Sequence, residues 1–144
     1  MQETPPDLYT DGPTPPSTLP LLQIVSLIST ASESAARPFT HQASTFVPLM
    51  RAAGFTDVSE TRLRLPIGAW PSEAIEKEIG RYNVLNVLEG VEAYTLALFT
   101  RVLGMSAEEV RELVERARAD VCNRKHRWYI WLYVFFPLSS PPNV

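Results

Sequence analysis

Hydrophobic and polar positions divide the first half of the chain into two helices and a strand. Apolar residues recur every three or four positions in two segments, which predicts helices over residues 19–34 and 44–53. Gly54 follows the second segment, at the place where a glycine commonly caps a helix C-terminus. Over residues 58–65 a strand is predicted, because Leu63 and Leu65 alternate with Arg62 and Arg64 at the period of two of a half-buried strand.

A third helix, predicted over residues 72–103, is the most informative segment. Its second half is apolar on nearly every face, and a helix with this pattern is expected to lie at the centre of a fold, covered on several sides. A minority of polar residues interrupts the pattern. Spacings of four and three place Tyr82, Asn86 and Glu89 together on one face of this helix.

The last third of the chain predicts a surface helix and a buried strand. Ser106 and Glu109 have the spacing of a capping box, which marks the start of a fourth helix. One side of that helix is apolar and the other is charged, as is typical of a helix at the surface. Residues 126–136 are dense in aromatic and β-branched side chains without a helical period, which predicts a strand covered on both faces.

Length and proline content suggest a single domain with irregular ends. The chain has 144 residues, enough for one domain, and its prolines crowd both termini. We therefore expect a proline-rich irregular segment over residues 1–18, a folded domain over residues 19–137 and an irregular tail over residues 138–144.

Composition removes several classes of function. The net charge of −3 argues against a nucleic-acid partner, which needs a basic surface. The single cysteine, Cys122, cannot form a disulfide within the chain, and with two histidines it makes a zinc site improbable, so no metal is expected. The N-terminus lacks the features of a signal peptide, and the longest apolar run is too short to span a membrane. A soluble, cytoplasmic protein is expected.

Several segments resemble one enzyme family. Residues 53–58 and 65–71 resemble a late strand of class I S-adenosylmethionine-dependent methyltransferases and the turn after it. Residues 80–83, 88–93 and 96–104 resemble more specifically the fungal methyltransferases of secondary metabolism, relatives of a global regulator of secondary-metabolite clusters. The opening Gln2–Glu3 is similar to the end of that family's fifth strand.

The resemblance implies an α/β fold, of which this chain is only a part. The family has a doubly wound, Rossmann-like sheet, and the chain resembles its C-terminal half, mostly helical with two or three strands. In the parent fold the final strand lies between the fifth and sixth strands. S-adenosylmethionine is bound in the N-terminal half, by a glycine-rich turn and an acidic residue. Neither feature occurs here, because no two glycines have the Gly-x-Gly spacing, so the cofactor is implied by the family only and we expect this chain alone to bind none.

The missing half has a consequence for association. Two strands alone are marginally stable in water, and the strand Trp128–Phe136 is expected to expose an unpaired edge. We therefore expect a homodimer, or docking to a methyltransferase partner chain, through this strand.

The family implies that the long helix borders the substrate cavity. On this basis we expect Glu89 and His41 to be catalytic, and we expect four residues to contact a small natural-product intermediate: Trp70, Tyr82, Asn83 and Asn86. A structural alternative is that the asparagines bond backbone groups and Glu89 pairs with a nearby arginine.

Three functions follow from these patterns. The function that the resemblance implies first is that of a methyltransferase-family protein of fungal secondary-metabolite biosynthesis, and we expect the chain to supply the substrate-side half and not to be competent for methyl transfer alone. One alternative is a repurposed, cofactor-independent cyclase or isomerase acting on a polyketide or terpenoid intermediate. The other is a non-catalytic partner subunit of a full-length methyltransferase.

Overall fold

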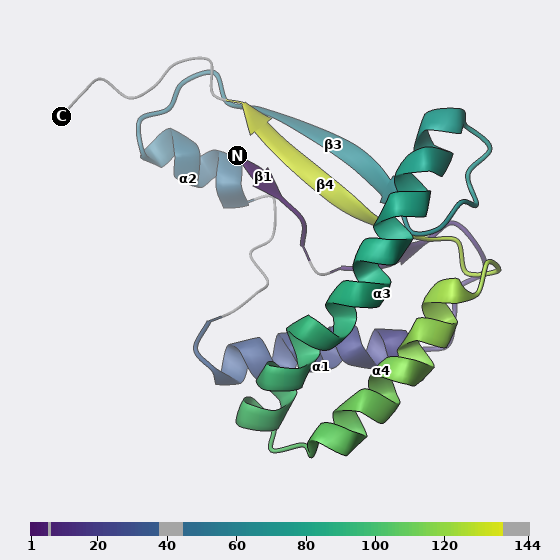
Figure 1. Cartoon of the computed structure of the whole chain (residues 1–144). Coiled ribbons are helices and arrows are strands. Elements are labelled where there is room, and N and C mark those ends of the chain that lie inside the picture. The colour runs from purple at the N-terminus through teal and green to yellow at the C-terminus, as the bar shows by residue number, and fades with distance from the viewer. Residues whose placement is uncertain (6, 38–44, 137–144) are drawn as a thin grey trace.

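The computed structural model describes residues 1–5, 7–37 and 45–136. Over these residues the chain is mixed α/β and mostly helical, as predicted (Figure 1). Four strands are present there rather than the two or three expected, because two very short strands lie in the N-terminal segment. The elements are β1 (Gln2–Glu3), β2 (Tyr9–Thr10), α1 (Pro20–Ser34), α2 (Phe46–Ala52), β3 (Ser59–Pro66), α3 (Ala74–Val102), α4 (Ala107–Cys122) and β4 (Trp128–Phe136).

The sheet is built around β4. Strand β3 pairs antiparallel with β4 along its length, from Ser59 opposite Phe136 to Pro66 opposite Tyr129. Because β3 occupies one edge of β4, the two short strands share the other edge, β1 beside Val134 and β2 beside Tyr129. The last strand of the chain thus lies between β1 and β3, the arrangement that the resemblance implies for the family's final strand.

The expectation of an unpaired edge on the last strand is wrong at its two ends, where β1 pairs with Tyr133 and Val134 and β2 pairs with Trp128 and Tyr129. Backbone bonds hold the N-terminal segment along this edge: the Met1 amino group donates to Phe135 O at 3.0 Å, and Asp11 N donates to Arg127 O at 3.1 Å. The expectation of an irregular segment over residues 1–18 is corrected at the same points, where β1 and β2 form. Both corrections have one cause: the backbone N–H and C=O groups on the outer edge of β4 need hydrogen-bond partners, and β1 and β2 supply them.

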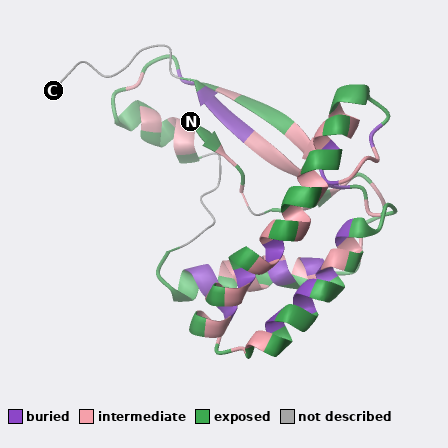
Figure 2. Ribbon diagram, viewed as in Figure 1, coloured by how far each residue is buried: buried purple, intermediate pink, exposed green. Residues whose placement is uncertain are grey.

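Helices α1, α3 and α4 pack together below the sheet in Figure 1. Their common core is closed by side chains with almost no exposure, among them Ile24, Phe99 and Val114. Figure 2 shows buried residues concentrated where these helices face one another. Helix α4 is amphipathic, as predicted, with Val110, Leu113 and the rest of its apolar stripe buried and its charged side outward. Among the helices that the structure describes, none has both the length and the apolar character to cross a membrane.

Helix α3 packs against α1, α4 and β3, but its outer side is uncovered, which corrects the prediction for that side. It runs unbroken for 29 residues, but only one side of it is buried, at Gly80, Val91, Thr95 and Phe99. Apolar side chains on its other side face solvent, with Leu85 55% exposed and Tyr82 69% exposed. The helix is apolar on this side, as the sequence indicates, but no described part of the chain covers it. We call the exposed residues Ile75, Tyr82, Leu85 and Glu89 the outer face of α3.

Candidate functional site

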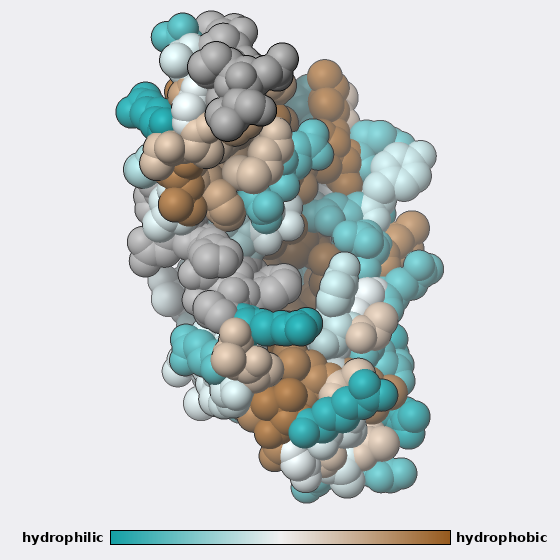
Figure 3. All heavy atoms as spheres, turned by 90° about the vertical axis from the view of Figure 1, so that its left-hand side faces the viewer, coloured by the Kyte–Doolittle hydropathy of each residue, from teal (hydrophilic) through white to brown (hydrophobic). Residues whose placement is uncertain are grey.

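A cleft of about 450 Å³ lies between the N-terminal segment, α1 and α3. Pro5 and Leu8 form one wall, Val25 and Ile28 of α1 form a second, and Val87 and Leu98 of α3 form a third. Ile67 and Ile130 close it at the end of the sheet. Figure 3 shows a hydrophobic hollow on this side of the molecule and a hydrophobic area below it, where α1 and α3 lie. A volume of this size and an apolar lining are typical of a small-molecule site.

Two of the expected substrate-binding residues, Asn83 and Asn86, lie in this cleft. Asn83 Nδ2 donates to Pro66 O at 2.9 Å, as the structural alternative predicted, and this bond leaves its side-chain oxygen as an acceptor. Asn86 is exposed and makes no side-chain hydrogen bond within the described part of the chain. The amide groups of these two residues are therefore available to orient a bound molecule.

Trp70 is placed by the structure at the junction of the sheet and α3, and it does not line the cleft. Its indole Nε1 donates to Trp128 O at 3.0 Å. The guanidinium of Arg64 lies 5.4 Å from the centroid of its ring and binds both carboxylate oxygens of Glu76, at 3.0 and 2.6 Å. The hydrogen bond to Glu76 raises the pKa of Arg64 above its usual value. Trp70 thus fixes the turn between β3 and α3.

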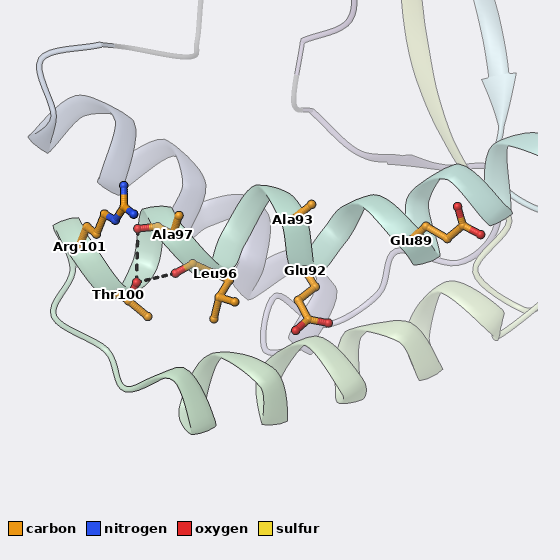
Figure 4. Close-up of a pocket in the computed structure, with 7 residues that line it drawn as sticks. All are labelled: Glu89, Glu92, Ala93, Leu96, Ala97, Thr100 and Arg101. Carbon is orange, nitrogen blue, oxygen red and sulfur yellow. Dashed lines mark hydrogen bonds between the residues drawn. The ribbon is translucent and has the colours of Figure 1, made fainter.

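Tyr82 and Glu89 share the exposed outer face of α3 with Asn86 beside them, so the predicted common face is present. Glu89 lies in a shallow depression whose seven lining residues all belong to α3 (Figure 4). Thr100 in this depression donates to Leu96 O at 2.8 Å, within its own helix. The second carboxylate in the depression, that of Glu92, forms ion pairs with Arg111 at 3.4 Å and Arg118 at 3.6 Å. A depression with a single wall does not enclose a substrate, and Glu89 is not among the described residues that line the cleft.

The two histidines do not complete the site. His41 lies outside the described residues. His126 lies in the turn before β4, where its Nε2 is 3.2 Å from Asn123 Nδ2 and its ring centroid is 5.0 Å from that of Trp128. Among the residues the structure describes, no group of three potential ligands is placed to hold a metal ion.

The glycines do not fit the binding of S-adenosylmethionine through a glycine-rich turn. A Cβ on Gly80 would lie 2.1 Å from Gly68 O, and one on Gly12 would lie 2.6 Å from Lys125 O, so both permit close packing of backbone. Gly54 and Gly104 follow α2 and α3 with φ of 91° and 70°, as C-terminal caps require. Each of these four glycines therefore has a structural role away from a phosphate- or carboxylate-binding loop.

Sequence reasoning missed the contribution of the N-terminal segment and of Arg37, which also lines the cleft. Pro5 and Leu8 sit in a segment without any periodic pattern. Arg37 follows α1 as a single charged residue, so no spacing distinguishes it from any surface arginine. Only the folded arrangement brings these residues into the same cleft as Asn83 and Asn86.

Comparison with known proteins identifies the family. The chain is 38% identical over 109 residues to the secondary metabolism regulator LAE1 of Cochliobolus heterostrophus, a match of 75% of this chain and 35% of that protein. It is 36% identical over 121 residues to the methyltransferase pytC of Aspergillus terreus, 83% of this chain and 37% of that protein. The chain belongs to this family of fungal secondary-metabolism regulators and methyltransferases. The family's regulator laeA of Monascus pilosus is 30% identical over 105 residues, 73% of this chain and 29% of that protein.

The chain spans about a third of the length of the family members it matches. The resemblance to the C-terminal half of the family is confirmed by these matches. No protein-family model matches the chain, and no solved structure does.

Proposed function

We propose that this chain is the substrate-side half of a methyltransferase-family protein of fungal secondary-metabolite biosynthesis. The observation that carries the proposal is the apolar cleft between α1, α3 and the N-terminal segment, with the amides of Asn83 and Asn86 in its wall. An apolar cleft with a few polar groups suits a small, weakly polar intermediate better than a charged metabolite. The relatedness to pytC, whose name states methyl transfer, supports the reaction class.

In this proposal the chain alone does not bind S-adenosylmethionine. The glycines serve turns and close packing, and the cleft has no carboxylate among its described lining residues to hold a ribose. A second chain carrying the cofactor-binding half completes the enzyme. We propose that it covers the outer face of α3, where Ile75 and Tyr82 are each 69% exposed. Tyr82 and Glu89 contact the substrate only if that chain closes over them.

Docking through β4 is the other proposed route of assembly, either to the cofactor-binding half or to a second copy of this chain. Strands β1 and β2 each contribute only two residues to its outer edge. A longer strand from another chain would replace two short ladders with a continuous one. This route requires the N-terminal segment to leave β4, whereas docking on α3 does not.

The test is reconstitution with the N-terminal, cofactor-binding half of pytC, produced as a separate chain. Calorimetry with S-adenosylmethionine is expected to give no binding heat for the 144-residue chain and saturable binding for the mixture. Methyl transfer to candidate cluster intermediates, followed by mass spectrometry, is expected only in the mixture. Stoichiometric binding of S-adenosylmethionine by the chain alone would overturn the proposal.

A second candidate function is a non-catalytic partner subunit of a full-length methyltransferase. The exposed apolar side chains of the outer face favour it, because a face of this kind commonly marks an interaction site. It predicts a stable complex with full-length pytC, no turnover in the reconstituted mixture and no binding of small apolar molecules in the cleft.

A further inference from the structure

We propose that the cleft binds an elongated, mostly apolar molecule that carries one acidic group, and that Arg37 binds this group. The inference rests on the proposed function and specifies the class of substrate. It concerns the shape of the cleft, the charge of its wall and the position of its two polar ends.

The shape of the cleft favours an elongated molecule. Its wall follows α3 from Asn83 to Leu98. With a rise of about 1.5 Å per residue, this stretch of helix is about 22 Å long. A volume of about 450 Å³ distributed along such a length gives a narrow channel rather than a round chamber. Val25, Ile28 and Val87 line it with aliphatic groups, which favour an alkyl or polyene chain.

The charge of the wall favours an anion. No carboxylate is present among the described residues that line the cleft, and Arg37 is the one residue there with a full charge at neutral pH. Its side chain forms no ion pair within the described part of the chain. A guanidinium offers a planar pair of donors that matches a carboxylate. An acidic group on the ligand therefore has a defined place to bind.

The two polar ends of the cleft are far apart. Arg37 lies just beyond the C-terminal end of α1, whereas Asn83 and Asn86 lie in the first half of α3 near the sheet. Figure 1 shows these two parts of the fold on opposite sides of the helical layer. The acidic group is thus expected at one end of the ligand, and a neutral hydrogen-bonding group such as a hydroxyl at the other.

Arg37 also has an ordinary structural explanation, which the test must separate from binding. A cation just past a helix C-terminus is favoured by the helix dipole, and the last turn of α1 contains no basic residue. That role predicts an effect of Arg37 on stability alone. The proposal predicts that Arg37 distinguishes an acid from its ester.

The probes are cis-parinaric acid and its methyl ester, whose fluorescence rises on binding, titrated into the whole chain. The acid is expected to bind about tenfold more tightly than the ester, and Arg37→Glu is expected to abolish this preference while leaving ester binding unchanged. The matched control is Arg51→Glu, which changes another exposed arginine at a helix end, outside the cleft. It is expected to keep the preference.

A second variant tests the location. Val87→Trp fills the cleft and is expected to weaken both probes at least tenfold, with circular dichroism and melting temperature showing that the chain remains folded. Equal binding of acid and ester by the wild type, or an unchanged preference in Arg37→Glu, would overturn the proposal. Absence of binding would also overturn it, yet methyl transfer in the reconstituted mixture would then still support the proposed function. Probe binding as expected, but no methyl transfer in the reconstituted mixture, would support the inference about Arg37 and overturn the proposed function.

Discussion

At the scale of single residues, Gly80 is the position at which the fold is least tolerant. It ends the second turn of α3 directly against the loop after β3, and Gly68 N donates to Gly80 O at 2.9 Å. A Cβ at Gly80 would meet Gly68 O at 2.1 Å, so backbone would have to move. We expect Gly80→Ala to lower the free energy of unfolding by about 3 kcal/mol, as overpacking of a rigid contact does.

Gly90 provides the matched control in the same helix. A Cβ there would lie 3.1 Å from the ring of Tyr94, which is 71% exposed and free to turn away. Because alanine is favoured over glycine in a helix interior, Gly90→Ala is expected to raise stability by about 0.5–1 kcal/mol. Urea unfolding of both variants checks the pair. Equal gains of stability in both variants would show that helix propensity, and not the contact with Gly68, determines the result.

The sequence predicted some of the residues of the site, but it did not predict which residues would lie next to them. Asn83 and Asn86 were found because two amides stand out on an apolar helix, and they lie in the cleft. Trp70 stands out equally, but its indole bonds Trp128 O in the folded chain. Which of several conspicuous residues face one cavity depends on contacts between segments far apart in the sequence, and no local spacing encodes them.

At the scale of elements, the start of α4 is the clearest agreement between pattern and structure. Ser106 Oγ accepts a bond from Glu109 N at 3.2 Å, and the Glu109 carboxylate accepts one from Ser106 N at 2.8 Å. The bond from the Ser106 backbone lowers the pKa of Glu109 below its usual value of 4.5. Local chemistry fixes this helix end, so the sequence suffices to predict it.

This lowered pKa predicts a dependence on pH. A depressed pKa in the folded state stabilises the fold above the usual pKa, and the stabilisation is lost as pH falls through the folded value. Melting temperatures of the wild type are therefore expected to fall more between pH 5 and pH 3 than those of Glu109→Gln, whose amide keeps the cap without a charge. Glu112→Gln, an exposed change one turn further along α4, is the control and is expected to follow the wild type.

The elements that escaped prediction are β1 and β2. A two-residue strand is too short to show a period, and Gln2–Glu3 was singled out only through resemblance to the family's fifth strand. Their positions are set by the edge of β4, more than a hundred residues away, whose backbone groups need partners. The pattern of β4 itself is local, and its strand was predicted to within two residues.

At the scale of the whole molecule, the apolar pattern of α3 and its exposure disagree, and the disagreement is informative. A helix with apolar residues on all sides is expected to be covered on all sides. Here α1, α4 and β3 pack against α3, while Leu85 on the outer face remains 55% exposed. This exposed apolar side supports the proposal that a second chain covers α3, and the match to LAE1 and pytC extends over only 35% and 37% of those proteins.

The exposed side of α3 leads to the last prediction, made with the N-terminal half of pytC as partner. Leu85→Glu places a charge on the outer face and is expected to weaken the complex at least tenfold, as loss of a central apolar contact does. Because Leu85 is solvent-exposed in the free chain, the substitution is expected to change the free energy of unfolding of that chain by less than about 0.5 kcal/mol. Leu49→Glu on α2, where the leucine is 59% exposed, is the matched control and is expected to leave binding unchanged.

The same measurement separates the two routes of assembly. If the partner docks on β4 instead, Leu85→Glu binds as the wild type does. Removal of residues 1–10, which frees the outer edge of β4, then strengthens the complex, because the partner strand no longer competes with β1 and β2. If the partner docks on α3, the same truncation leaves the outer face intact and does not strengthen the complex. Sedimentation equilibrium of the three variants with the partner half therefore decides which surface the partner occupies.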